Sequence, residues 1–182
     1  MLTTLTVILI FFLSVQVFPV AIGINVKGEW PKAILFIGIL SFIQVLTYWL
    51  GLKLGSTFMQ LMDGFKSAVF LIGFLLIGIR MLMEVFSIRK GLRSYSIASA
   101  QHVILASLAQ GMNTFLAGLL FYYLAVDSTF TITLIAATTV VISTIGIVLK
   151  PEKTNLALAS LLYVIGGIAM IIISIYISFF IF

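Results

Sequence analysis

Residues 2–24 read LTTLTVILIFFLSVQVFPVAIGI and contain no charged side chain. A membrane-spanning helix needs about 20 mostly apolar residues, so this stretch can cross a bilayer once. Similar runs follow, and we expect six spans at about residues 2–24, 33–54, 66–87, 97–126, 129–149 and 155–181. The runs are continuous rather than alternating, which favours helices over barrel strands. The sequence therefore predicts an all-α polytopic membrane protein.

The composition excludes several classes of protein. Of 182 residues, 63% are hydrophobic and 8% are charged, against roughly 45–50% and about 25% in a soluble domain. With no cysteine and one histidine, a disulfide framework or a thiolate metal site is excluded. Paired carboxylates at the expected midplane and a glycine-rich phosphate loop are also missing, so we expect neither an enzyme nor a cofactor.

The net charge of +5 is better explained by membrane topology than by nucleic-acid binding. The first, third and fifth expected loops carry Lys27, Lys32, Arg89, Lys90, Arg93, Lys150 and Lys153, whereas the second and fourth carry Lys53 and Lys66. Basic residues favour the cytoplasmic side, so we expect both termini outside. The first span lacks a preceding basic residue and a small-residue cleavage pattern, so we interpret it as a retained span rather than a signal peptide.

The two halves of the sequence resemble each other. Three matches occur in the same order: Gln16-x-Phe18 with Asn113-x-Phe115, Leu50-Gly51 with Ile145-Gly146, and Gly78-Ile79-Arg80-Met81 with Gly167-Ile168-Ala169-Met170. Three spans per unit is an odd number, so the second unit must insert upside down, as in many secondary transporters. We predict one membrane domain, 1–182, with repeat one at about 1–88, a basic cytoplasmic loop at 89–96 and repeat two at about 97–182.

Polar side chains gather near the expected span centres, where they cost free energy unless they are paired or functional. Gln16, Gln44, Asn113 and Thr139 lie there, with Ser143 and Thr144 within about two turns. Pro19 has no N–H, which deprives the Val15 carbonyl of its helical partner. These residues are either helix–helix contacts or a substrate site between the repeats. We expect spans one, two, four and five to form the core, braced by three and six.

Glu84 is the single acid deep within an expected span, and it follows Arg80 by four residues, on the same helix face. Both lie nearer the cytoplasmic end than the middle. The pair is either a mutually neutralising contact or a gate at the inner mouth.

These motifs resemble the MntP-type manganese efflux pumps of bacterial inner membranes, within the LysE-like transporter superfamily. The third-span pattern G-x-[RK]-M-x-x-E-x-F is present as Gly78, Arg80, Met81, Glu84 and Phe86, and the fifth-span S-T-x-G is residues 143–146. Residues 13–23 stand where the family carries L-S-M-D-A-F-A-x-S-I-G, and residues 109–118 stand where it carries A-x-S-x-D-A-x-A-x-G.

The departures from the family pattern concern its charges. Gln16 and Asn113 replace the Asp residues of the first and fourth spans, and Gln44 replaces an acid often found in the second. Mn²⁺ prefers carboxylate, carbonyl and water oxygens, and amides retain only the carbonyl oxygen. If a metal binds at all, the resemblance implies Gln16 and Asn113 as its ligands.

The leading hypothesis is a multi-pass inner-membrane transporter that moves Mn²⁺ as substrate by alternating access. It would contact the lipid bilayer and a small inorganic cation or small solute, and no nucleic acid. The sequence is compatible with a homo-oligomer. Two alternatives are a family member that moves a neutral solute and a non-transporting membrane scaffold or subunit.

Overall fold

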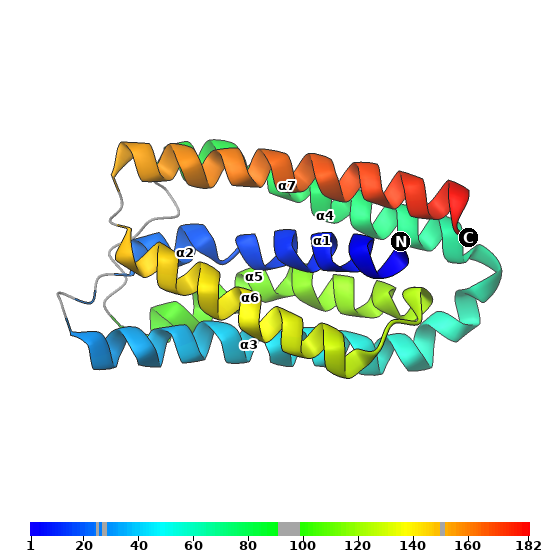
Figure 1. The fold of residues 1–182 in the computed structure, drawn as a ribbon, viewed down its shortest axis with the longest axis horizontal. Helices are drawn as coiled ribbons and strands as arrows, with labels where there is room; N and C mark the ends of the chain where they lie inside the picture. The colour runs from blue at the N-terminus through cyan, green and yellow to red at the C-terminus, as the bar shows by residue number, and fades with distance from the viewer. Residues whose placement is uncertain (25, 27–28, 91–98, 150–151) are drawn as a thin grey trace.

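The computed structural model describes residues 1–24, 26, 29–90, 99–149 and 152–182, and these residues are almost entirely helical (Figure 1). The elements are α1 (Leu2–Val15), α2 (Phe18–Gly23), α3 (Trp30–Phe58), the 3-10 helix η1 (Met59–Phe65), α4 (Lys66–Arg89), α5 (Ala100–Phe121), the 3-10 helix η2 (Tyr122–Leu124), α6 (Ser128–Val148) and α7 (Lys153–Phe180). The all-α prediction is confirmed for this part of the chain.

The apolar stretches lie where the sequence predicts them. Five helical stretches of the described chain are long and apolar enough to cross a membrane: Leu2–Gly23, Trp30–Arg89, Ala100–Leu124, Ser128–Val148 and Lys153–Phe180. The second and third expected spans fall together in the 60-residue stretch Trp30–Arg89. Within it α3 runs to one end of the molecule, η1 turns the chain, and α4 returns beside α7 (Figure 1).

The helix ends divide into two groups (Figure 1). The two chain termini lie at one end of the bundle with η1 and the α5–α6 connection. The end of α2, the start of α3, the end of α4 and the start of α7 lie at the other. Most of the expected basic loop 89–96, together with Lys27, Lys150 and their neighbours at 25, 28 and 151, lies outside the described residues.

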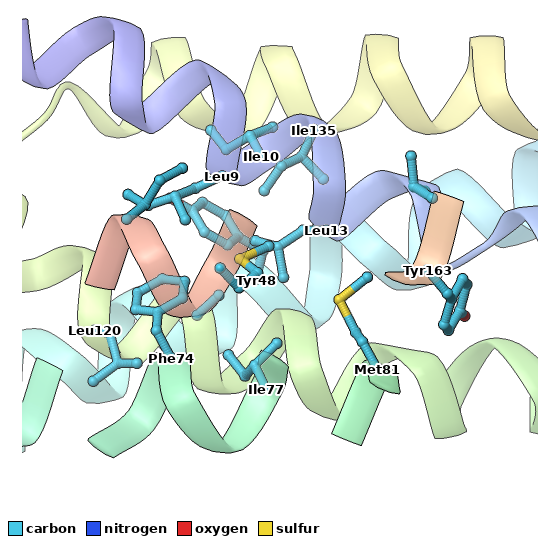
Figure 2. Packing of buried hydrophobic residues seen from close by; sticks show 14 of the residues in the cluster. Leu9, Ile10, Leu13, Tyr48, Phe74, Ile77, Met81, Leu120, Ile135 and Tyr163 are labelled. Carbon is cyan, nitrogen blue, oxygen red and sulfur yellow. The ribbon is translucent and has the colours of Figure 1, made fainter. Parts of the chain in front are cut away.

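The broken helix α1–α2 lies in the middle of the bundle, between the α4–α7 pair and the group of α3, α5 and α6 (Figure 1). Its own residues are correspondingly buried, from Leu9 and Ile10 in α1 to Ala21 and Ile22 in α2. Figure 2 shows how side chains from six helices meet in this core: α1 supplies Leu9, α3 Tyr48, α4 Ile77, α5 Leu120, α6 Ile135 and α7 Tyr163. Large apolar side chains such as Phe42, Met83 and Phe86 cover the outside, as expected of a surface in contact with lipid.

Glycines bring the helices into backbone contact, and the contacts join residues that the sequence matches across the two halves. A Cβ atom on Gly78 of α4 would lie 2.8 Å from the Gly167 carbonyl oxygen, and one on Gly167 of α7 would lie 2.9 Å from the Gly78 carbonyl oxygen. Because this contact is reciprocal, α4 and α7 cross with the same glycine face toward each other.

A second pair of contacts follows the same correspondence. Gly51 of α3 packs against the Phe115 carbonyl of α5, and a Cβ atom on Gly146 of α6 would lie 3.2 Å from the Phe18 carbonyl oxygen of α2. Gly51 and Gly146 are matched residues, and so are Phe115 and Phe18. The second long helix of each half therefore packs on the first helix of the other half.

Candidate substrate site

The candidate site forms where the first helix is interrupted. α1 ends at Val15, α2 begins at Phe18, and Pro19 occupies the first turn of α2. Proline removes a backbone donor, and so the helix cannot continue with regular bonding through this point. The Tyr163 hydroxyl of α7 donates a 2.7 Å hydrogen bond to the Gln16 carbonyl. The sequence pointed to the Val15 carbonyl as the one without a helical partner. In the structure, the carbonyl that accepts the Tyr163 bond belongs to the next residue, Gln16.

Gln16 and Asn113, two of the polar residues expected near the span centres, contact each other. The Asn113 Nδ2 donates a 2.7 Å hydrogen bond to Gln16 Oε1, and both side chains are 1% exposed. The Gln16 Nε2 lies 3.6 Å from the Met81 sulfur, a weak acceptor on α4. Two matched positions of the two halves therefore touch each other in the buried centre of the bundle.

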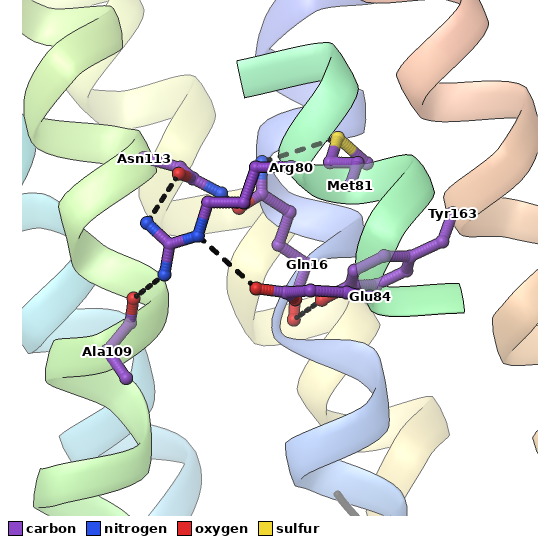
Figure 3. A network of polar contacts seen from close by, with 7 residues as sticks. All are labelled: Gln16, Arg80, Met81, Glu84, Ala109, Asn113 and Tyr163. Carbon is purple, nitrogen blue, oxygen red and sulfur yellow. Dashed lines mark hydrogen bonds and ion pairs between the residues drawn. The ribbon is translucent and has the colours of Figure 1, made fainter. Parts of the chain in front are cut away.

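Arg80 contacts the same site through three hydrogen bonds. Its Nη1 donates to Asn113 Oδ1 at 2.9 Å, its Nη2 to the Ala109 carbonyl at 3.0 Å, and its Nε to Glu84 Oε1 at 3.3 Å (Figure 3). Figure 3 shows the guanidinium reaching from α4 to Asn113 and Ala109 of α5. The pair Arg80–Glu84 and the pair Gln16–Asn113 are parts of one network.

The charges within this network cancel. The Arg80 side chain is 34% exposed and the Glu84 side chain 8%, so the carboxylate is the deeper partner. A buried carboxylate without a partner is strongly unfavourable, and the guanidinium offsets its charge at short range. The site as it stands is polar and close to neutral.

The remaining amide lies at the contact of α3 with α5. Gln44 accepts a 2.5 Å hydrogen bond from the Thr114 hydroxyl and donates to the Ser107 carbonyl at 3.4 Å. Beside it on α5, both amide atoms of the buried Gln110 and the Ser107 hydroxyl have no hydrogen-bond partner among the described residues. Gln44 thus bonds within its own interface, apart from the Gln16–Asn113 contact.

The predicted residues of α6 divide between two faces. Thr139 donates to Ser14 at 3.5 Å, and Ser14 also shares a 2.6 Å hydrogen bond with Thr138. Ser143 is fully buried, and its hydroxyl has no partner among the described residues. Thr144 is exposed and donates to the Val140 carbonyl of its own helix. The structure therefore places Thr139 and Ser143 inside the bundle and Thr144 on its outer surface.

The sequence predicted the third and sixth spans, now α4 and α7, as braces and singled out only Arg80 and Glu84 within them as candidate site residues, so it missed three contributors to the network. They are the Tyr163 hydroxyl, the Met81 sulfur and the Ala109 carbonyl. Of the three, Tyr163 could have been found from the sequence, because its hydroxyl stands in an otherwise apolar stretch of the last span. In the second half, α5 is continuous through Gly111, whose missing side chain makes room for Thr47.

One hollow adjoins this network at Ala109, and another lies apart from it at the η2 end of the bundle. A recess of about 550 Å³ at the η2 end of the bundle is lined by Lys53, Ser56, Tyr122 and Asp127 among others. An apolar groove of about 530 Å³ runs along α3 and α5 and includes Thr47, Ala109 and Met112. Among the residues that the structure describes, no group of three or more His, Cys, Asp or Glu could hold a metal ion.

The fold and the site define a multi-pass helical membrane protein with a polar, charge-neutral centre. Residues 27–178 match the family described as "Putative manganese efflux pump", and the chain belongs to this family of membrane transporters. The match confirms the resemblance seen in the motifs; it includes Arg80, Glu84 and Asn113, and it begins after Gln16. No curated protein and no solved structure gives a match.

Proposed function

We propose that this protein exports a small cation, with Mn²⁺ as the leading candidate, by alternating access around the Gln16–Asn113 contact. The observation that carries the proposal is the buried network in which Gln16, Asn113 and Arg80 join the two halves at a helix break. Interrupted helices facing the partner repeat are the usual place of substrate sites in secondary transporters. Membership of the manganese efflux family supports a divalent cation as the substrate class.

The proposal includes six membrane crossings in the bacterial inner membrane. α3 has 29 residues and α4 has 24, which corresponds to lengths of about 44 and 36 Å, whereas the hydrocarbon core is about 30 Å thick. Each helix is long enough to cross by itself, with η1 as the turn between them. The end that carries Lys32, Arg89, Lys90 and Lys153 would face the cytoplasm, and both termini would lie outside.

The glycine contacts support an inverted repeat. If a twofold axis relates the halves, matched residues near the axis must contact each other, and matched residues elsewhere must make equivalent contacts. Two contacts join matched residues directly, as expected near the axis: Gly78 with Gly167, and Gln16 with Asn113. Gly51 on Phe115 and Gly146 on Phe18 are an equivalent pair.

The arrangement corresponds to a closed state, because the oxygens of the site are already used. Gln16 Oε1, Asn113 Oδ1 and Glu84 Oε1 each accept a hydrogen bond from within the protein. Opening toward either side would separate α1–α2 and α4 from α5 and release these oxygens to a cation. Glu84 would supply the charge, while the amides would supply orientation and neutral oxygens.

A neutral solute is the second candidate, favoured by the pairing of Glu84 with Arg80. This pairing leaves the site without net charge in the closed state, and a neutral ligand avoids the cost of bringing a divalent ion into a low dielectric. The scaffold alternative gains support from the same packing, since amides bonded across helices also hold helices together.

Uptake of Mn²⁺ into inverted membrane vesicles separates these alternatives. The wild type should accumulate Mn²⁺, Asn113→Ala should lose most of this uptake, and Asn155→Ala at the start of α7 is the matched control. Expression in an exporter-deficient cell should also relieve manganese sensitivity.

Absence of both effects would exclude Mn²⁺ as the substrate. The double variant Gln16→Asp with Asn113→Asp then decides between the alternatives. Manganese transport that appears only with the two carboxylates would indicate a fold that still moves a different solute, whereas a folded but inert variant would support the scaffold.

A further inference from the structure

We propose that the Arg80 guanidinium is a built-in competitor for the transported cation: it holds the oxygens of a cation site and must leave before a cation can bind. The inference rests on the proposed transport function and names the residue that regulates its site. It assigns the cation position to Glu84 Oε1, Asn113 Oδ1 and the Ala109 carbonyl, with Gln16 adjoining.

The geometry of Arg80 is that of a ligand in a site. Three of its N–H groups donate to three oxygens from two helices, at 2.9 Å to Asn113, 3.0 Å to Ala109 and 3.3 Å to Glu84. The three acceptors are a carboxylate, a side-chain amide and a backbone carbonyl, which are the oxygen types that hard cations take. An arginine that served only to neutralise Glu84 would need one of these contacts.

The charges follow from this arrangement. With the guanidinium in place, the positive charge of Arg80 cancels the carboxylate of Glu84, and a second cation would be repelled at short range. With Arg80 displaced, the same oxygens carry one net negative charge. The site therefore binds one cation at a time, either the guanidinium or the substrate.

Arg80 is also the member of the network that can move. About a third of its side chain is exposed, whereas Glu84 is 8% exposed and Asn113 1%. The guanidinium end can swing away on its flexible stem while Glu84 and Asn113 keep their places in α4 and α5. Asn113 also bonds to Gln16 at 2.7 Å, so departure of Arg80 leaves a prearranged amide oxygen.

Equilibrium binding of Mn²⁺ to the purified protein in lipid nanodiscs tests this competition, with the loss of the free Mn²⁺ paramagnetic resonance signal as the readout. Arg80→Gln should bind Mn²⁺ at least tenfold more tightly than the wild type, because it removes the competing charge and keeps a neutral polar side chain. The added change Glu84→Gln should abolish this gain. Arg89→Gln, an exposed arginine at the end of the same helix, is the matched control and should equal the wild type.

Arg80→Lys is a second variant, for use if Arg80→Gln does not fold. It keeps the positive charge at this position. An ammonium group is a point charge that cannot match three separated oxygens as a planar guanidinium does. We expect its Mn²⁺ affinity to lie between those of the wild type and Arg80→Gln.

The outcomes separate this inference from the proposed function. If the wild type transports Mn²⁺ and neither folded Arg80 variant binds it more tightly, the competition is refuted and transport stands. If the wild type fails to transport while Arg80→Gln binds Mn²⁺, the competition stands and manganese export by the wild type fails. If neither the wild type nor any variant binds Mn²⁺, both proposals are refuted.

Discussion

Asn113 donates a 2.7 Å hydrogen bond to the side-chain oxygen of Gln16 across 97 residues of sequence, and both side chains are buried. The bond joins α5 to the break between α1 and α2, so the two halves of the chain meet through matched residues. Arg80 bonds to the same Asn113 from α4. A movement of one half relative to the other would therefore stretch or break this hydrogen bond. The coupling energy between Gln16 and Asn113 can be measured.

A double-mutant cycle on Gln16→Leu and Asn113→Leu should show coupling of about 0.6–2 kcal/mol, the range of hydrogen bonds between membrane helices. Each single variant leaves its partner amide unsatisfied in a buried place, so the double variant should cost less than the sum. Unfolding in mixed micelles measures the free energies. Gln60→Leu in the exposed η1 is the control, and it should add to Asn113→Leu within about 0.5 kcal/mol. Additive effects for the Gln16–Asn113 pair would show that the two side chains act independently.

Gly78→Ala should destabilise the protein by about 1–3 kcal/mol, because a methyl group must displace a packed backbone. The new Cβ would lie 2.8 Å from the Gly167 carbonyl oxygen, and a carbonyl in the middle of α7 cannot turn aside. Thermal unfolding in detergent measures the effect.

Gly38→Ala is the matched control for this substitution, since no atom lies within 4 Å of a Cβ at Gly38 in α3. It should leave stability unchanged or raise it by about 0.5–1 kcal/mol through helix propensity. Equal stability of the two variants would contradict the tight crossing of α4 with α7.

Tyr163→Phe should cost about 0.5–1.5 kcal/mol, the net value of one hydrogen bond. The ring remains, so packing is preserved, while the Gln16 carbonyl at the helix break loses its 2.7 Å donor. Hydrogen exchange of the backbone around Gln16 should quicken along with the fall in unfolding temperature. Tyr176→Phe removes a hydroxyl that bonds to the Met1 sulfur in an exposed position, and it should change neither quantity. A Tyr163→Phe variant with unchanged exchange would mean that the break is held by other contacts.

The absence of cysteine from the sequence makes the topology directly testable. Single variants Asp63→Cys in η1 and Lys90→Cys after α4 place one thiol at each end of the bundle. A membrane-impermeant maleimide applied to intact cells should label Asp63→Cys alone, and Lys90→Cys should react only after permeabilisation. The reverse pattern would place the termini in the cytoplasm, and labelling of both in intact cells would rule out a double crossing by Trp30–Arg89.

Much of the candidate site follows from the sequence because polar residues in long apolar runs are conspicuous. Gln16 and Asn113 stand out at matched places in the two halves, and the structure brings them together. Thr144 shows the limit of such reasoning. It follows Ser143 directly, but each residue turns an α-helix by about 100°, so Ser143 is buried and Thr144 faces outward.

The sequence alone determined the all-helical membrane class, the approximate positions of the spans, the distribution of basic residues and the internal matches. Each of these depends on the order of residue types along the chain. The length of an apolar stretch, for example, decides whether a helix can span the bilayer. Only the tertiary structure decided that Arg80 and Glu84 share the site with Gln16 and Asn113, and that Tyr163 supports the helix break. Contacts between helices depend on their rotation and relative height, which close packing of side chains and glycines determines and local composition does not.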